Sequence, residues 1–235
     1  LLTCNDAIGE DATAVFNMLS GYSEPPAWNK LMVAPIWLKD RFLMLINREA
    51  DNAKKGKKAR IVAKMNSLCD PMIIEALYKA SAAGVQIDLI IRGICCLKVG
   101  IPGISENIRV RSIVGNFLEH SRIFYFYNDG FEDVYMGSAD WMPRNLDKRV
   151  EITFPVEDET LKQEVIDILK LQLADTLKAH ILLPDGREYA KQDLRGLEKI
   201  AAQDEFCKQA MNRKSKIDKD VVRNIFEPAV PPAEE

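Results

Sequence analysis

The chain has 235 residues, of which 47% are hydrophobic and 29% are charged. This composition excludes a disordered, collagen-like or coiled-coil rod protein. The 32 Lys and Arg residues are balanced by 35 Asp and Glu residues, for a formal net charge of −3. A protein that coats nucleic acid is basic, so no nucleic-acid partner is expected, and any anion must be met by a local cluster of Arg and Lys.

The cysteines indicate a reducing compartment. Their number, five, is odd, two of them are adjacent (Cys95 and Cys96), and none forms a C-x-x-C pair. This disfavours a disulfide framework and a zinc site and favours the cytoplasm. No apolar run reaches the roughly 18 residues of a membrane span, and no signal-peptide pattern is present. Because the chain opens at Leu1 without an initiator Met, we expect it to be part of a longer protein.

The first half of the chain alternates between helical and strand-like patterns. Residues 8–20 have helical spacing and are followed by Pro25 and Pro26, which predicts a domain boundary after residue 28. Strands are expected at 30–36, 59–65 and 85–91, and helices at 38–54 and 71–83, the second helix starting at Asp70 as N-cap and Pro71. The β-α-β-α-β order predicts a parallel sheet covered by helices.

The second half has a different character. Strands are expected at 108–114, 123–127, 134–137 and 150–154, with a hairpin at Asn128-Asp129-Gly130. Helices are expected at 161–177 and over the polar residues 191–220, followed by a frayed tail. The fold class predicted is therefore α/β, with a mixed, mostly parallel sheet flanked by helices.

Candidate site residues follow the strands, because ligands bind open parallel sheets at the carboxyl ends of their strands. Cationic and amide side chains at several such ends would form a pocket suited to phosphate oxygens, which Arg binds in bidentate fashion and Lys as a point charge. The candidates for binding phosphate are Lys64, Asn66, Arg92, His120 and Arg122, and the supporting candidates are Ser138, Asp140 and Arg144.

Simpler interpretations stay open at this point. Arg92 could form a structural ion pair with Glu106 or Asp88, and Cys95-Cys96 is typical of packing rather than reactivity. An isolated His such as His120 is structural about half the time. His180, which follows a helix without a polar cluster, is expected to be a surface histidine.

Three segments, at 64–71, 87–126 and 134–158, closely resemble the C-terminal part of bacterial polyphosphate kinases, and the resemblance covers about residues 1–190. It implies two consecutive phospholipase-D-like domains. Residues 1–28 would end the first of them, 29–190 would form the second, and 191–235 would be a helical extension with a disordered tail. His120-Ser121-Arg122 and Gly137-Ser138 are similar to the His-x-Lys and Gly-Ser motifs of that superfamily, but the usual Asp is not at its expected place, which disfavours nuclease or lipase chemistry.

The resemblance also implies an activity. The family transfers the ATP γ-phosphate reversibly to a histidine and then to inorganic polyphosphate. Arg92 and His120 match positions that face the ATP phosphates, and His120 matches the second active-site histidine. The phosphorylated histidine and the arginines associated with Mg²⁺ would lie upstream of Leu1, so no metal ligand is expected here. A homo-oligomer, located in the cytoplasm or peripherally at the inner membrane, is expected for the full-length enzyme.

Two other functions remain as alternatives. The first is a phospholipase-D-like phosphodiesterase that completes its site by dimerising. The second is a polyphosphate- or nucleotide-binding module without turnover. In the leading hypothesis this chain alone is inactive, because it holds one histidine in a suitable context where the full site is expected to hold two.

Overall fold

The computed structural model describes residues 1–21, 23, 25–184, 186, 188–191 and 193–220. Its helices are α1 (Asp6–Leu19), α2 (Leu38–Lys54), α3 (Pro71–Ala82), α4 (Pro143–Asp147), α5 (Glu159–Leu173) and α6 (Ala202–Asp220). Its strands are β1 (Met32–Ala34), β2 (Arg60–Met65), β3 (Gln86–Ile91), β4 (Ile108–Ile113), β5 (Arg122–Phe126), β6 (Asp133–Gly137), β7 (Glu151–Pro155), β8 (Ala179–Leu182) and β9 (Tyr189–Lys191). Among these described residues, no helix is long and apolar enough to cross a membrane.

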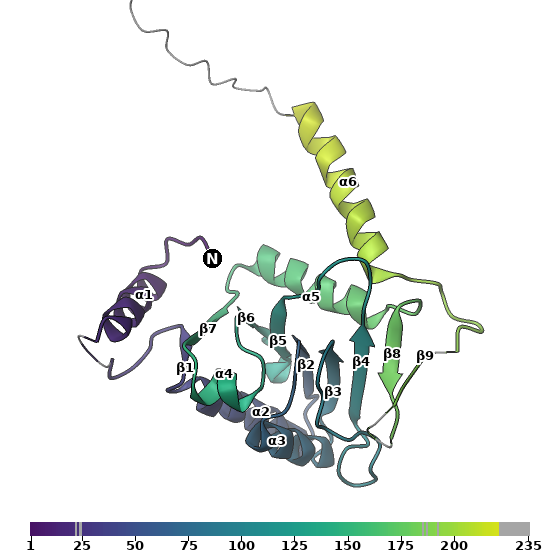
Figure 1. The fold of residues 1–235 in the computed structure, drawn as a ribbon, viewed down its shortest axis with the longest axis horizontal. Coiled ribbons are helices and arrows are strands. Elements are labelled where there is room, and N and C mark those ends of the chain that lie inside the picture. The colour runs from purple at the N-terminus through teal and green to yellow at the C-terminus, as the bar shows by residue number, and fades with distance from the viewer. Residues whose placement is uncertain (22, 24, 185, 187, 192, 221–235) are drawn as a thin grey trace, which may run out of the picture.

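The strands of the described residues form one sheet in the order β1-β7-β6-β5-β2-β3-β4-β8-β9 (Figure 1). The predicted α/β class with a mixed sheet flanked by helices is confirmed, but the sheet is not mostly parallel: among the described residues two of its eight strand pairings are parallel and six are antiparallel. Parallel pairing is found in β2-β3 and β3-β4, with Met65 opposite Ile91. The strands on either side of this parallel unit pair antiparallel to their neighbours.

The prediction that the first strand begins the parallel sheet was wrong. β1 lies at the far edge and pairs antiparallel with β7, with Val33 opposite Ile152. The β5–β6 hairpin takes the free edge of β2 instead, with Lys64 opposite Ile123. The order of elements along a chain restricts strand pairing but does not determine it, because pairing depends on which surfaces meet.

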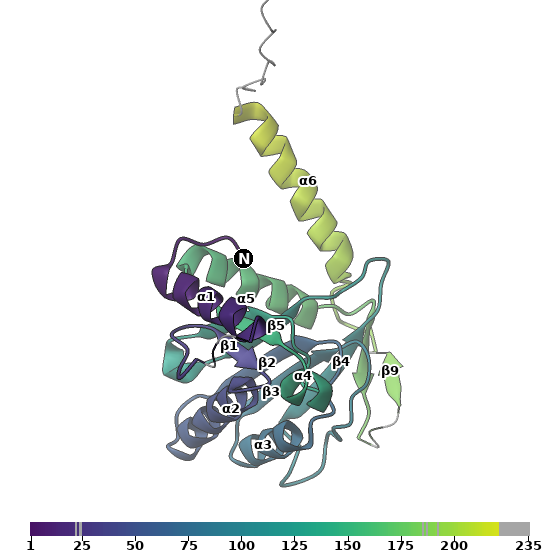
Figure 2. The same ribbon diagram turned by 60° about the vertical axis from the view of Figure 1, so that its left-hand side comes forward.

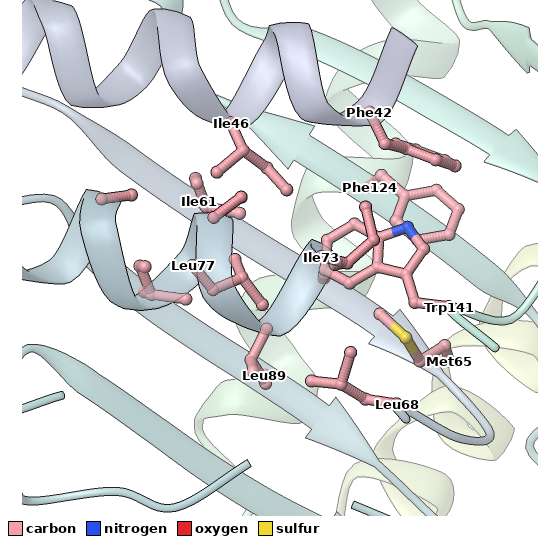
Figure 3. Packing of buried hydrophobic residues seen from close by; sticks show 14 of the residues in the cluster. Phe42, Ile46, Ile61, Met65, Leu68, Ile73, Leu77, Leu89, Phe124 and Trp141 are labelled. Carbon is pink, nitrogen blue, oxygen red and sulfur yellow. The ribbon is translucent and has the colours of Figure 1, made fainter. Parts of the chain in front are cut away.

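Helices cover the two faces of the sheet (Figures 1 and 2). α2 and α3 pack on one face and α5 on the other. On the α2 face the rings of Phe42, Phe124 and Trp141 pack together, with centroids 4.6–5.4 Å apart (Figure 3). Side chains alternate between the faces of a strand, so Ile61 joins the α2–α3 core while Val62 packs toward α5.

Two local predictions are confirmed in detail. The Asp70 side chain accepts hydrogen bonds from the amides of Met72 and Ile73 at the start of α3, as an N-cap does. Residues 128–130 form a short 3-10 turn between β5 and β6, in which Asn128 and Asp129 have positive φ angles of 46° and 56°. Asn and Asp tolerate this left-handed conformation better than most residues do.

The C-terminal part differs most from the prediction. α5 ends at Leu173 rather than at residue 177, and β8 and β9, which were not predicted, extend the sheet beyond β4. The predicted helix over 191–220 begins only at Ala202. β8 and β9 are short strands near a sheet edge, where half-exposed residues leave little alternation in the sequence. The predicted tail after residue 220 lies outside the described residues.

Helix α1 packs against the β1–β7 edge of the sheet, where Ile8 and Val15 join a small core with Val33. Asp11 of α1 is buried, and its carboxylate accepts hydrogen bonds from the amides of Asn29, Lys30 and Leu31 at 2.7–2.9 Å. These bonds connect α1 to the segment that leads into β1. The domain boundaries expected after residues 28 and 190 stay predictions.

Candidate phosphate-binding site

Four neighbouring strands, β2, β3, β5 and β6, have ends at the same end of the sheet, which we call the edge of the site. Asn66 follows β2 and Arg92 follows β3, at the carboxyl ends of two parallel neighbours. β5 runs antiparallel to β2, so its first residue, Arg122, and the preceding His120 lie at the same edge. Arg122 is opposite Gly137, the last residue of β6, which brings Asp140 to this edge as well. We call Lys64, Asn66, Arg92, His120, Arg122 and Asp140 the cationic cluster.

Asp140 connects two parts of the cationic cluster. Its carboxylate is almost fully buried and accepts hydrogen bonds from the Asn66 amide N–H at 2.8 Å and from Arg122 Nε at 3.1 Å. The side-chain oxygen of Asn66 in turn accepts from Nε and a terminal nitrogen of Arg92, at 3.1 and 2.6 Å. Asn66 therefore has its orientation set by Asp140 and sets the orientation of Arg92.

Lys64 is the buried cation of the cluster, only 3% exposed. Its Nζ donates to the carbonyl and hydroxyl oxygens of Ser121, at 3.1 and 2.8 Å, and lies 3.3 Å from a carboxylate oxygen of Glu119. Burial lowers the pKa of Lys64, the Glu119 carboxylate opposes this shift, and the charges of Arg92 and Arg122 add to it. Lys64 thus lies beneath the edge and holds the loop on which His120 lies.

His120 is exposed at the surface of the cluster. A terminal nitrogen of Arg122 lies 2.9 Å from His120 Nδ1 and donates to the His120 carbonyl at 2.8 Å. Arg122 thereby links the imidazole to Asp140. An imidazole held next to a guanidinium at an open edge can exchange a proton or a hydrogen bond with a phosphate oxygen.

Gly93 allows the two loops that carry Asn66 and Arg92 to approach each other. Its amide donates to the Asn66 carbonyl at 2.7 Å. A Cβ at this position would lie 3.0 Å from that carbonyl oxygen and 3.1 Å from Ser67 Oγ. A larger residue would therefore push the loops apart and lengthen the Arg92–Asn66 contact.

Two of the supporting candidates, Ser138 and Arg144, form no hydrogen bond or ion pair with the cationic cluster within the described residues. Ser138 is exposed, and its hydroxyl oxygen accepts from the Ile152 amide at 3.2 Å. It lines a largely apolar groove of about 860 Å³ between α1 and the β6–β7 strands, which Arg122 also reaches. Arg144 is exposed on α4. Burial raises the pKa of the Cys69 thiol, and the positive charge of Arg144 opposes this shift.

The structure can be compared with the simpler interpretations of Arg92, Cys95-Cys96 and His180. The ion pair suggested for Arg92 with Glu106 or Asp88 was wrong within the described residues, because Arg92 binds Asn66 instead. Asp88 pairs with Arg60 and Arg109, each at 2.8 Å, and Glu106 accepts from the Gly103 amide. Cys95 packs against the core, as expected, and burial raises the pKa of its thiol to about 11. Cys96 is exposed, so the packing interpretation was wrong for this residue. His180 lies on β8, where its Nδ1 is 3.1 Å from the Lys178 carbonyl.

The sequence analysis missed a group of neutral and acidic residues behind His120. Glu119 bonds to Lys64, to Gln172 of α5 at 3.0 Å and to Gln203 of α6 at 3.1 Å. Gln172 and Gln203 are 53 and 84 residues away from Glu119 in the sequence, so no local spacing could identify them. A polar residue buried on an otherwise amphipathic helix, such as Gln172, was the available signal.

The carboxylates at this edge do not fit a magnesium site. Mg²⁺ prefers oxygen ligands in octahedral geometry. Asp140 is engaged by Arg122 and Asn66, and Glu119 by Lys64 and two amides. Within the described part of the chain, no group of three or more His, Cys, Asp or Glu side chains could hold a metal ion.

Comparison with known proteins gives a consistent result. The family model described as "Polyphosphate kinase C-terminal domain 2" matches residues 31–203. The chain is 52% identical over 211 residues to a polyphosphate kinase of Synechocystis sp., covering 90% of this chain and 29% of the relative. It is 55% identical over 186 residues to a polyphosphate kinase of Pseudomonas aeruginosa, covering 79% of this chain and 27% of the relative.

The three-dimensional structure has a similar match. The crystal structure of the Porphyromonas gingivalis polyphosphate kinase superposes with a TM-score of 0.86 at 41% identity, covering 91% of this chain and 33% of that one. The chain therefore spans about three-tenths of the length of the curated relatives it matches.

Proposed function

Because this chain belongs to the polyphosphate kinase C-terminal domain 2 family, we propose that it supplies one half of the active site of a polyphosphate kinase, a reversible ATP:polyphosphate phosphotransferase. The observation that carries this proposal is the cationic cluster, in which Lys64, Arg92, Arg122 and His120 lie at the ends of neighbouring strands, with Arg122 in contact with His120. Phosphoryl transfer depends on positioning and on stabilising charge at the phosphoryl oxygens, and this cluster offers both.

The proposed reaction has two steps. A histidine from outside this segment attacks the γ-phosphorus of ATP; a N–P bond forms, the bond to the β-phosphate oxygen breaks, and ADP leaves. The terminal oxygen of polyphosphate then attacks the phosphohistidine, so that a P–O bond forms and the N–P bond breaks. Arg92 binds oxygens of the ATP phosphates, and His120 donates a hydrogen bond or a proton to the leaving or transferring oxygen.

The residues of the cluster divide this work. Arg92 has further N–H donors beyond those bound by Asn66, so it can bind phosphate while Asn66 holds its orientation. Lys64 is buried beneath the cluster, where its positive charge attracts the phosphate and its hydrogen bond keeps the Ser121 backbone in place. Arg122 orients His120 from the side. Magnesium would be held by the phosphates and by residues outside this segment.

The remaining parts of the proposal concern the whole enzyme. Its partners are ATP or ADP and inorganic polyphosphate, and it assembles as a homo-oligomer without nucleic acid. We place it in the cytoplasm or peripherally at the inner membrane. All five cysteines are free thiols, which supports a reducing compartment.

The experiment that tests this function uses γ-labelled ATP with the full-length enzyme and with the 235-residue chain alone. We expect a labelled phosphopeptide outside this segment, polyphosphate synthesis by the full-length enzyme, and none by the chain. Label on His120, or turnover by the chain alone, would contradict the proposal that the phosphorylated histidine lies outside this segment. Cleavage of a phosphodiester by the chain would favour the phosphodiesterase alternative, and binding of polyphosphate by an inactive full-length protein would favour a binding module.

A further inference from the structure

We infer that Gln203, at the start of α6, is a positioning residue that holds the loop carrying His120. This inference rests on the proposed function and adds to it a structural link between the C-terminal helix and the site. Figures 1 and 2 show α6 projecting from the body of the molecule. Among residues 201–213, whose burial is described, the buried ones are Ala201, which precedes the helix, and Ala202 and Gln203 in its first turn.

The first turn of α6 is fixed to the body of the domain. The Ala202 amide donates to the buried carboxylate of Asp175 at 2.7 Å, and Asp175 also accepts from the Lys178 and Ala179 amides before β8. The Ile200 amide donates to the Thr176 hydroxyl at 2.9 Å. Gln203 therefore starts from a backbone position that has little freedom.

From this position the Gln203 side chain binds the loop at both of its polar ends. Its oxygen accepts from the Phe117 amide at 3.1 Å, and its nitrogen donates to the Phe117 carbonyl at 2.8 Å. The same nitrogen donates to Glu119 at 3.1 Å. A side-chain amide that pairs with a backbone amide in both directions fixes that backbone as a neighbouring strand would.

Gly115 leaves room on the loop for the Gln203 side chain, which a larger residue at position 115 would displace. A Cβ at Gly115 would lie 2.2 Å from the Gln203 side-chain oxygen, which is far inside van der Waals contact. Beyond Phe117 the loop has only Leu118 and Glu119 before His120. Glu119 continues the network to Lys64, which binds Ser121 on the other side of His120. His120 is thus held from both sides along the chain.

The loop has few other contacts to hold it. Val114, Phe117 and Leu118 are 64%, 59% and 70% exposed, so their apolar side chains contribute little packing. Without the Gln203 hydrogen bonds the loop would sample other conformations, and His120 would spend less time in the reactive geometry. Ground-state binding by Arg92 depends on Asn66 and Asp140, and in the described part of the chain neither of them forms a hydrogen bond with Gln203.

The test compares Gln203→Met, which keeps the length of the side chain and removes its hydrogen bonds, with Gln203→Glu, which places a carboxylate against Glu119. Gln209→Met, on the exposed part of α6, is the matched control. In the 235-residue chain we expect the Phe117 amide to exchange hydrogen at least about tenfold faster in Gln203→Met, which removes the oxygen that accepts from it. Amides of β2 and β3, and all amides in Gln209→Met, keep their wild-type rates.

In the full-length enzyme we expect kcat to fall about 10- to 100-fold in both Gln203 variants while KM for ATP changes less than about threefold. A purely structural residue would instead lower the fraction of folded, phosphorylatable enzyme without changing kcat per active site. Unchanged Phe117 exchange in Gln203→Met, or a wild-type kcat in both variants, overturns the inference. If the wild-type enzyme is inactive, the proposed function is refuted instead. The hydrogen-exchange measurement needs no activity, so it still tests whether Gln203 holds the loop.

Discussion

Arg122 Nε lies 3.1 Å from Asp140 Oδ1, and the two side chains are only 11% and 6% exposed. The same carboxylate oxygen accepts the amide N–H of Asn66. One buried anion therefore sets the position of the guanidinium beside His120 and of the amide that orients Arg92. In water such a pair would contribute little, but a buried pair leaves an uncompensated charge when one partner is removed.

Asp140→Ala should lower the free energy of unfolding by about 3–5 kcal/mol, because Arg122 would stay buried without its anion. Urea denaturation of the chain measures this change. Asp167→Asn is the control, since Asp167 is exposed on α5 and its ion pair with Lys170 is solvent-screened. We expect less than about 0.5 kcal/mol for the control. A loss for Asp140→Ala as small as that of the control would show that Asp140 does not hold the cluster together.

Arg92→Ala in the full-length enzyme should lower kcat/KM for ATP more than it lowers stability. A charge-assisted hydrogen bond to phosphate contributes on the order of 1.5–3 kcal/mol, equivalent to roughly a 10- to 150-fold loss. Arg92→Lys should restore only part of the activity, because a lysine cannot bind Asn66 and a phosphate with a planar fork. Steady-state kinetics decide: full activity of Arg92→Ala would exclude a phosphate-binding role for Arg92, and full activity of Arg92→Lys would show that a positive charge suffices without the planar fork.

His120→Ala in the full-length enzyme should reduce transfer from ATP to polyphosphate by at least about 10²-fold, the lower end of what general acid–base help contributes. Its melting temperature should stay near the wild-type value, because the side chain is exposed. His180→Ala, on β8 at the opposite side of the parallel unit, is expected to be near neutral. If His120→Ala kept as much transfer activity as the near-neutral control His180→Ala, His120 would have only a structural role.

Asp88→Asn should change the response of the chain to acid. Burial alone would raise the pKa of Asp88, but hydrogen bonds and charges from Arg109 and Arg60 outweigh it and hold the pKa below its usual 3.8. A carboxyl whose folded pKa is depressed contributes stability above its unfolded pKa, and this contribution is lost as the pH falls through the folded pKa.

The Asp88→Asn variant should therefore be about 1–2 kcal/mol less stable than the wild type at neutral pH, and the difference should shrink as the pH drops below about 4. Denaturation curves over a pH series measure this. Asp51→Asn, which breaks an exposed pair with Lys54, should show a small difference at every pH. A difference for Asp88→Asn that does not depend on pH would mean that its ionisation does not stabilise the fold.

Local chemistry in the sequence determined most of the elements and several parts of the site. Asp70 before Pro71 marked the start of α3, and Asn128-Asp129-Gly130 marked the turn of a hairpin, because each depends on residues close in the chain. Lys64, Asn66, Arg92, His120, Arg122 and Asp140 could be placed near one edge because they flank strand ends.

Only the tertiary structure decided which partners these residues take. Asp88 binds Arg60 and Arg109 rather than Arg92, β1 pairs with β7 rather than beside β2, and Gln203 reaches Phe117 across 86 residues of chain. Each choice depends on surfaces that meet only after the sheet and helices have packed. Periodicity and capping act over a few residues and contain no information about such contacts, so partner choice follows from packing rather than from local sequence.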